Sequence, residues 1–296
     1  MYLTGFADEA ARGVDGQIKA TKQLGWHHIE ARSIDCVNIV DLPDEKFEQI
    51  LEKLNSADIK INCIGSTIAN WSKQITDDFD ITISDVKRAI PKTHKLNTKM
   101  IRIMSYAILK DKGSDEQMEQ ERFRRLREIK KMFDDAGIIP VHENCQNYGG
   151  MSYKHTLRLL ENVPGLRLVF DTGNPILSED YSRQKPYPKQ SSWEFYSNIK
   201  ESIAYIHIKD GKWDTNAQKA VYCWPGDGHG DIKRILKDLI LKGYAGGISI
   251  EPHIATVFHE KLNNDNEDVM FNSYIEYGRR LGSIINDIKK EVSRAK

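Results

Sequence analysis

The sequence of 296 residues predicts one (β/α)8 TIM barrel, an α/β fold with its active site at the C-terminal ends of the strands. Short apolar runs alternate with helix-like stretches from end to end, which is typical of parallel strands joined by helices. No glycine-rich phosphate fingerprint follows the first run, which argues against a doubly wound dinucleotide-binding sheet. Because no repeat or linker divides the sequence, we expect a single domain over residues 1–296.

Eight runs have the length and composition of buried strands, and several of them close on a polar residue. We expect strands at 3–8, 27–31, 59–65, 100–105, 138–143, 166–171, 204–208 and 247–251. Runs of this length separated by helical patterns favour eight strand–helix units over a smaller open sheet.

The stretches between the runs carry apolar residues at helical spacing, such as Phe47, Ile50 and Leu54. We expect helices over 16–25, 42–57, 115–137, 152–163, 191–202, 231–243 and 266–294, the last of which would cover the outer wall or bottom of the barrel. Longer connections follow strands at 65–82, 144–152, 172–191 and 209–229. These connections should build the substrate-binding face, with the Pro- and Tyr-rich 172–191 segment as a candidate lid.

Composition excludes several classes of partner. Lys+Arg and Asp+Glu both number 43, so the formal net charge of +0 gives no reason to expect nucleic acid or an anionic membrane as a partner. The four cysteines are far apart and form no CxxC pair, which favours free thiols in a reducing compartment. The N-terminal segment lacks a signal-peptide pattern, and no stretch reaches the roughly 18 apolar residues of a membrane span. We therefore expect a soluble, cytoplasmic protein.

Four runs in the second half of the chain, IIPVHE, LRLVFD, IAYIHI and GISIE, carry an ionisable residue at or near their ends: Glu143, Asp171, His207 and Glu251. All strands of a parallel barrel end at one face, so these side chains should converge there. Three carboxylates and one imidazole suit one divalent ion, which could be Mn, Co, Mg, Zn or Fe. Such a site would be slightly anionic and open to a neutral, hydroxyl-rich ligand. The alternative is ordinary packing, with His207 bonded to backbone and Glu251 paired with a base such as Lys209.

Five segments resemble one superfamily. They are VHEN (141–144), FDTGN (170–174), IHIKDG (206–211), PGDGHGD (225–231) and SIEPH (249–253). Together they resemble the xylose-isomerase-like TIM barrels, also called AP endonuclease family 2, and are nearest to the D-tagatose 3-epimerase and inosose-processing branch. The resemblance implies that Glu143, Asp171, His207 and Glu251 bind one metal ion. It further implies that Glu143 and Glu251 are catalytic, removing and returning a proton beside a metal-bound carbonyl through an enediolate.

The resemblance implies an isomerase or epimerase of a sugar or polyol, and a homo-oligomer. A lyase or dehydratase acting on a keto-polyol or glycoside is the second hypothesis, and a barrel that binds a ligand without catalysis is the third. An endonuclease IV-like enzyme is disfavoured by the zero net charge and because its further histidine positions hold other residues here, among them Ser105 and Asn174.

Five further residues are candidates for substrate binding: Lys209, Asn174, His253, His142 and Trp71. Lys209 and His253 each follow a proposed metal ligand by two residues and so share its strand face. Asn174 stands where sugar epimerases usually carry a histidine, which leaves the identity of the substrate open. His142 would point away from the site on an ideal strand, so packing is its alternative role. Trp71 lies in a predicted active-face connection, where an indole ring could stack on a sugar.

Overall fold

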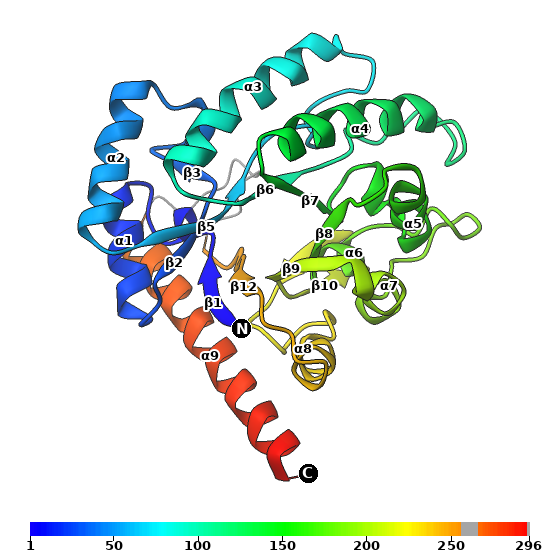
Figure 1. Ribbon diagram of the computed structural model, residues 1–296. Coiled ribbons are helices and arrows are strands. Elements are labelled where there is room, and N and C mark those ends of the chain that lie inside the picture. The colour runs from blue at the N-terminus through cyan, green and yellow to red at the C-terminus, as the bar shows by residue number, and fades with distance from the viewer. Residues whose placement is uncertain (256–265, 295–296) are drawn as a thin grey trace.

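The computed structural model describes residues 1–255 and 266–294. In this part of the chain, eight parallel strands form one sheet in the order β1-β12-β9-β8-β7-β6-β5-β2, and helices surround it (Figure 1). The strands are β1 (Tyr2–Gly5), β2 (His28–Ala31), β5 (Lys60–Gly65), β6 (Met100–Ile103), β7 (Ile139–Glu143), β8 (Arg167–Asp171), β9 (Ile203–Ile208) and β12 (Gly247–Ile250). The predicted TIM barrel is confirmed, and each of the eight predicted runs overlaps one of these strands.

The barrel closes between its first two strands through a single bridge. Phe6 pairs with Glu30 beyond the end of β1, and the chain then enters a 3-10 turn, η1 (Ala7–Glu9). The predicted first strand over 3–8 is therefore too long at its C-terminal end. On the other side of β2, the pairing with β5 skips one residue, so that Ile29 faces Ile61 and Glu30 faces Cys63. Such a bulge changes the direction of the side chains that follow it.

Seven helices overlap the predicted helical stretches. They are α1 (Val14–Gln23), α2 (Asp44–Ser56), α4 (Glu119–Asp135), α5 (Tyr153–Asn162), α7 (Ser192–Ile199), α8 (Ile232–Leu241) and α9 (Glu267–Arg294). Asp231 precedes α8, but its side chain makes no capping hydrogen bond and its φ is 51°. Capping by an N-terminal Asp needs an extended backbone at that residue, which this left-handed conformation does not provide.

One long helix has no counterpart among the predicted helices. Helix α3 (Phe79–Lys95) begins inside the predicted connection 65–82 and contains Pro91 together with the β-branched run Ile81–Ile83. Both features lower helix propensity. Burial of Val86 and Ala89 against the barrel favours the helix despite this.

Two hairpins and a short helix lie in segments that the sequence marks only as connections. Residues 33–38 form the β3 (Ser33–Ile34) and β4 (Val37–Asn38) hairpin. The segment 209–229 contains the β10 (Gly211–Asp214) and β11 (Lys219–Tyr222) hairpin, and the 172–191 segment begins with α6 (Asn174–Leu177). Helix α6 contacts β10, so the two segments meet over the barrel.

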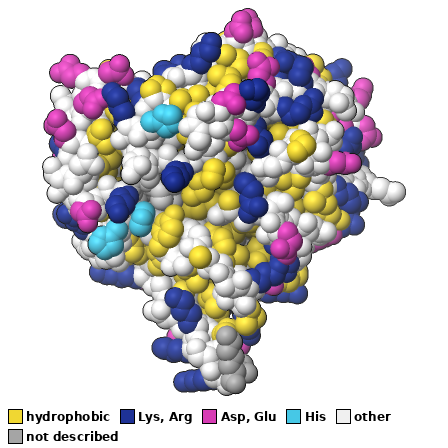
Figure 2. All heavy atoms as spheres, in the orientation of Figure 1, with side chains coloured by type: hydrophobic (Ala, Val, Ile, Leu, Met, Phe, Trp, Pro, Cys, Tyr) yellow, Lys and Arg dark blue, Asp and Glu magenta, His cyan; other side chains and the backbone are white. Residues whose placement is uncertain are grey.

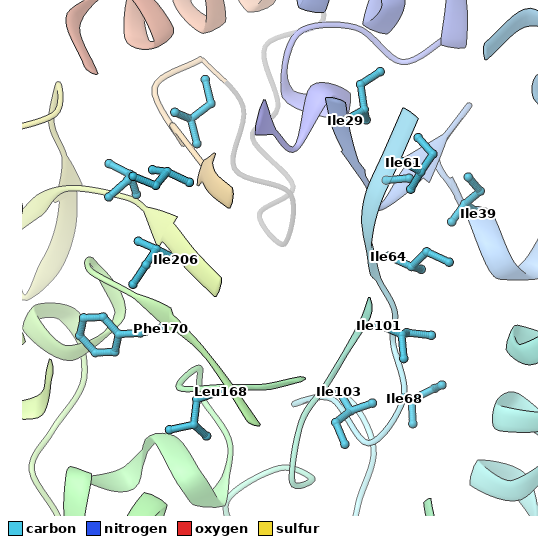
Figure 3. Packing of buried hydrophobic residues seen from close by; sticks show 14 of the residues in the cluster. Ile29, Ile39, Ile61, Ile64, Ile68, Ile101, Ile103, Leu168, Phe170 and Ile206 are labelled. Carbon is cyan, nitrogen blue, oxygen red and sulfur yellow. The ribbon is translucent and has the colours of Figure 1, made fainter. Parts of the chain in front are cut away.

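The core has an outer and an inner part. Figure 3 shows labelled residues such as Ile64, Ile101 and Phe170 on the outside of the strand ring, where the helices cover them. A smaller cluster of Cys63, Val141, Val169 and Tyr205 packs separately. Side chains alternate along a strand, so residues two positions after members of this second cluster share their side of the sheet.

The outer helices carry charges of both signs, and basic and acidic side chains intermingle on the face seen in Figure 2. Within the described residues, no helix combines the length and apolar character that crossing a membrane requires. The location in the cytoplasm remains a prediction from the sequence.

Candidate metal centre

Strand alternation and register bring four ionisable residues together. Glu143 and Asp171 follow Val141 and Val169 by two residues, and His207 follows Tyr205 by two. Asp171 pairs directly with His207 across β8 and β9. Glu251 comes one residue after β12 and donates its backbone N–H to the carbonyl of Ile208. The C-terminal ends of β7, β8, β9 and β12 therefore deliver these four side chains to the same place.

The four side chains form a buried cluster whose ligand atoms all lie within 4.8 Å of one another. Small adjustments would let one divalent ion contact all four at the usual distance of about 2.0–2.2 Å. Three of the buried atoms receive no hydrogen bond of good geometry from the described residues: Glu143 Oε2, Asp171 Oδ2 and His207 Nδ1. Glu143 Oε2 and Asp171 Oδ2 lie beside the cations of Arg102 and Lys209 without a hydrogen bond to them, so these oxygens can still coordinate a divalent ion, and the residues fit a metal ion.

Backbone donors fix the orientation of Asp171. Its Oδ1 accepts hydrogen bonds from the N–H groups of Gly173 and Asn174, at 2.8 and 2.7 Å. The second oxygen is thereby directed to the cluster. Gly173 also makes room beside the site, because a Cβ there would lie 2.7 Å from Lys209 Cγ. The FDTGN segment therefore positions both a carboxylate and a neighbouring lysine.

A carboxylate on the far side of the barrel orients the imidazole. Glu30 Oε1 lies 3.0 Å from His207 Nε2, and both side chains are completely buried. Burial lowers the pKa of His207, but the carboxylates of Glu30 and Glu143 raise it to about 10, so the metal-free imidazole carries a proton on both nitrogens. Its Nδ1 lies 3.5 Å from Glu143 Oε1, and a metal ion bound at Nδ1 would replace the proton there. A carboxylate in the position of Glu30 is what metal-binding histidines commonly use to fix their tautomer.

Three buried cations contact the carboxylates of the cluster. Arg102 Nη1 is 3.0 Å from Glu143 Oε2, Arg32 Nη1 is 2.8 Å from Glu251 Oε1, and Lys209 Nζ is 2.9 Å from Glu251 Oε2. The Lys209 ammonium also lies 3.2 Å from Asp171 Oδ2. The ion pair between Lys209 and Glu251, considered above as the alternative to metal binding, is thus present within the same cluster.

These charges shift the pKa values of the carboxylates in different directions. Burial alone would raise the pKa of Glu143 and Glu251, but Arg102 lowers that of Glu143 and Lys209 lowers that of Glu251. Burial raises the pKa of Asp171, and the positive charge of Lys209 only partly opposes it. Glu143 and Glu251 are accordingly the carboxylates held most firmly in the ionised form.

A cavity of ≈ 250 Å³ opens above the cluster, a size that suits a small ligand. Glu143 and Glu251 line it, and so do four of the five residues expected to bind substrate: Lys209, Asn174, His253 and Trp71. Trp213 and Tyr222 of the β10–β11 hairpin also border the cavity. The hairpin therefore covers part of the face where the sequence predicted only loop.

His142 precedes Glu143 on β7, and its side chain lies on the opposite face of the strand. Its Nε2 is 3.0 Å from Ser105 Oγ, and a Cβ at Gly149 would lie 2.3 Å from its ring. The ring does not border the cavity described above. Burial lowers the pKa of His142 to about 4, so this imidazole is neutral at pH 7. A role in substrate binding remains a prediction, and the contacts are those of a packed side chain.

The glycine-rich PGDGHGD segment wraps around Asp210. The two carboxylate oxygens of Asp210 accept from the backbone N–H groups of Gly226, Gly228 and Gly230, at 2.8 to 3.0 Å. A Cβ at Gly228 would lie 2.2 Å from Asp210 Oδ1, so the loop needs a glycine there. Asp227 and His229 are exposed and belong to neither of the two candidate ligand clusters.

A second group of possible ligands, Glu9, Glu251 and His253, lies beside the first. Arg32 Nη2 is 3.1 Å from Glu9 Oε1, and His253 Nδ1 is 3.0 Å from the same oxygen. Because a guanidinium already supplies the positive charge at this place, the group does not require a second metal ion.

Sequence reasoning missed Glu30, Arg32 and Arg102. A signal existed for Glu30, because the run HHIEA also brings a carboxylate to the end of a strand. Arg102 lies inside the run MIRIMS, and Arg32 follows β2 directly. Basic residues at such places give no local sign of whether they face the barrel axis or the solvent.

The fold and the cluster together define a TIM barrel with a candidate metal site at the C-terminal ends of its strands. A sequence model of the xylose isomerase-like TIM barrel family matches residues 18–270, and the chain belongs to this family. A search of curated proteins finds no match.

Solved structures with the same fold include several enzymes. A D-tagatose 3-epimerase-like protein is 16% identical with a TM-score of 0.71, covering 99% of this chain and 100% of that one. The zinc-bound IOLI protein is 13% identical with a TM-score of 0.69, covering 97% and 99%. A probable 3-DHS dehydratase, AsbF of Bacillus anthracis, is 17% identical with a TM-score of 0.66, covering 92% and 97%. At these identities the similarity establishes the fold.

Proposed function

We propose that this chain is a divalent-metal-dependent isomerase or epimerase of a sugar or related polyol. The placement of Glu143 and Glu251 carries the proposal, since both belong to the ligand cluster and both line the cavity. Glu143 ends β7 and Glu251 follows β12, with β8 and β9 between them. Carboxylates that reach a substrate from two directions can take a proton from one face of a carbon and return it to the other.

The proposed mechanism assigns separate roles to the metal ligands and to the basic residues beside them. A metal ion held by Glu143, Asp171, His207 and Glu251 would polarise a substrate carbonyl and acidify the adjacent C–H group. Arg102 and Lys209 hold the pKa values of Glu143 and Glu251 low, which keeps both carboxylates ionised and able to bind a cation. Three carboxylates and one imidazole suit Mn, Co, Mg, Zn or Fe, and manganese is the first ion to test.

Metal content and proton exchange test the proposal. We expect near one metal ion per chain in the wild type, and incorporation of solvent deuterium into an isomeric product from at least one ketose in a panel incubated in D2O. Glu251→Gln should lose the metal and reduce turnover about a hundredfold or more, because a ligand and a proton-transfer group are removed together. Glu276→Gln, an exposed control of the same chemistry on α9, should change neither. A wild type without metal, even after addition of Mn or Zn, would contradict the mechanism.

A lyase is the second candidate, and Lys209 is the observation that favours it. Its ammonium lies 3.2 Å from Asp171 and 2.9 Å from Glu251, where it could protonate a hydroxyl group that leaves after the same carbon is deprotonated. Products distinguish the two reactions, because a lyase releases water or an aglycone whereas an isomerase or epimerase gives an isobaric product.

The proposed ligand is accordingly a small carbohydrate or polyol. Similarity to proteins described as sugar epimerases supports this class, as do the aromatic rings of Trp71 and Trp213 that line the cavity. The expected homo-oligomer remains a prediction.

A further inference from the structure

The hairpin of β10 and β11 has two different faces. Trp213 pairs directly with Ala220, and Tyr222 lies two residues further along β11, so all three share one face. The same three residues line the cavity. Val221, between Ala220 and Tyr222, belongs to the other face and is exposed. The hairpin therefore gives the cavity an apolar wall that contains two aromatic rings.

The base of the hairpin is held close to the ligand cluster. Cys223 donates its backbone N–H to the carbonyl of Asp210 at 3.0 Å, directly after the end of β11. The ring of Tyr222 stands at 87° to the imidazole of His253, with 4.9 Å between the centroids. His253 Nε2 in turn lies 3.8 Å from Glu251 Oε1. Tyr222 therefore forms a part of the wall that is close to the proposed metal ligands.

Trp213 lies further out along the same wall. It is two residues further from the base of the hairpin than Tyr222, which corresponds to about 7 Å of strand. The 172–191 segment fixes its ring from outside the hairpin. Lys189 Nζ lies 3.5 Å from the centre of the indole and donates to the carbonyl of Leu177 at 3.0 Å. The indole is thus ordered before any ligand binds, which reduces the entropy lost on binding.

The surroundings of Trp213 are apolar on the cavity side. Ala220 lies opposite it on β11, and Leu177, at the end of α6, lines the same cavity. Helix α6 contacts β10, so Leu177 and Trp213 belong to neighbouring elements. An indole bordered by small and aliphatic side chains suits a flat apolar group, which gains both contact area and ring stacking there.

We infer that the substrate is a sugar or polyol with a flat apolar substituent, such as an aromatic aglycone, and that Trp213, Ala220 and Leu177 bind this substituent. The polyol part would lie at the ligand cluster beside Tyr222, and the substituent would extend along the hairpin. This inference rests on the proposed function, because it places the reacting polyol at the metal ligands. A sugar joined through its anomeric carbon has no free carbonyl there, so the mechanism would act on a ketone elsewhere in the ring.

Matched glycosides test the inference by equilibrium binding. Calorimetry in the presence of manganese would compare the methyl and phenyl glycosides of D-glucose and D-galactose in both anomers, together with cellobiose and lactose. These compounds probe recognition only, since they carry no ring ketone. We expect the phenyl glycoside to bind at least about tenfold more tightly than the matching methyl glycoside in one case or more, as burial and stacking of one ring can supply.

Variants on the two faces of the hairpin assign the effect to Trp213. Trp213→Ala should bring the ratio of phenyl to methyl affinity close to one while the metal content and the Tm change little. Trp213→Phe should keep a preference for the phenyl glycoside, because a smaller ring still stacks. Val221→Ala, on the exposed face of the same strand pair, is the matched control and should keep the wild-type ratio.

The outcomes separate this inference from the proposed function. Equal binding of the methyl and phenyl members, tightest binding of a disaccharide, no binding of any glycoside, or an equal loss in Trp213→Ala and Val221→Ala would overturn the apolar subsite. A chain that holds metal and exchanges the proton of a free ketose, yet shows no preference for phenyl glycosides, would keep the proposed function alone. A chain that prefers phenyl glycosides but exchanges no substrate proton would retain the subsite and lose the isomerase mechanism.

Discussion

Glu30 acts on the candidate metal site through His207 without belonging to the ligand cluster. Its carboxylate lies at the seam between β1 and β2, where Phe6 pairs with it, and meets His207 Nε2 at 3.0 Å. Phe6 supports the same imidazole edge-on, with 5.0 Å between the ring centroids. The orientation of one proposed ligand therefore depends on how the barrel closes on its opposite side.

Replacing Glu30 by Gln tests this positioning role. The amide oxygen can still accept from Nε2–H, but the negative charge that increases the basicity of the imidazole is lost. We expect the metal dissociation constant to rise by roughly tenfold or more, as for other residues that orient a metal-binding histidine. Competition with a chromogenic chelator would measure it on the purified chain. Wild-type affinity in this variant would show that Glu30 serves the fold only, and Glu276→Gln provides the matched exposed control.

At the level of elements, α5 begins with a cap that also holds a buried histidine. Ser152 is the N-cap residue, and its Oγ lies 2.7 Å from His155 Nδ1. The ring of Tyr148 packs edge-on against the imidazole. Burial lowers the pKa of His155 to about 4, with Arg158 adding to the effect. The first turn of α5 therefore contains a neutral imidazole, and protonating it would destabilise the folded chain.

This burial predicts that the protein loses stability in mild acid. As the pH falls below about 6.5, the unfolded chain binds a proton at His155 that the folded chain takes up only near pH 4. The free energy of unfolding should therefore fall by about 2 kcal/mol between pH 7 and pH 5 from this residue alone. Urea titrations of wild type and His155→Gln at both pH values would measure it. The variant should show the smaller decrease, and identical decreases would refute the assignment.

At the scale of the whole molecule, the proposed ligands connect distant parts of the chain. Glu143 and Glu251 are 108 residues apart, and four different strands hold the cluster. The long helix α9 packs against α1, α8 and η1, and its buried Tyr274 and Leu281 help to hold the start and the end of the barrel together (Figure 1). Only the folded barrel assembles the complete ligand set.

Metal binding should consequently stabilise the whole barrel. An ion that binds the folded chain alone, at a free concentration 100 times its dissociation constant, adds about 2.7 kcal/mol to the free energy of unfolding. We expect the Tm to rise with manganese and to return after treatment with a chelator. Calorimetry of Glu251→Gln at the same ion concentration should show little or no rise. An equal rise in both proteins would locate the stabilising ion elsewhere.

The eight strands and the four ionisable residues near their ends can be predicted from local sequence. A buried strand appears in the sequence as a short apolar run, and a polar residue at the end of that run can be identified without knowing the fold. The register of Asp171 against His207 then follows from the parallel barrel. Helix α3 could not be predicted from local sequence because its helix propensity is poor. Burial of its apolar residues against the barrel favours the helix, and that burial is a property of the folded chain.

Which charges neutralise one another depends on the folded arrangement of the strands. Arg32, Arg102 and Glu30 find their partners in other elements of the fold, and the distance in sequence from Arg32 to Glu251 is 219 residues. The inward direction of Glu30 also follows a bulge that no local pattern revealed. Charge balance in a buried site depends on contacts between distant segments, so it can be read only from the assembled barrel.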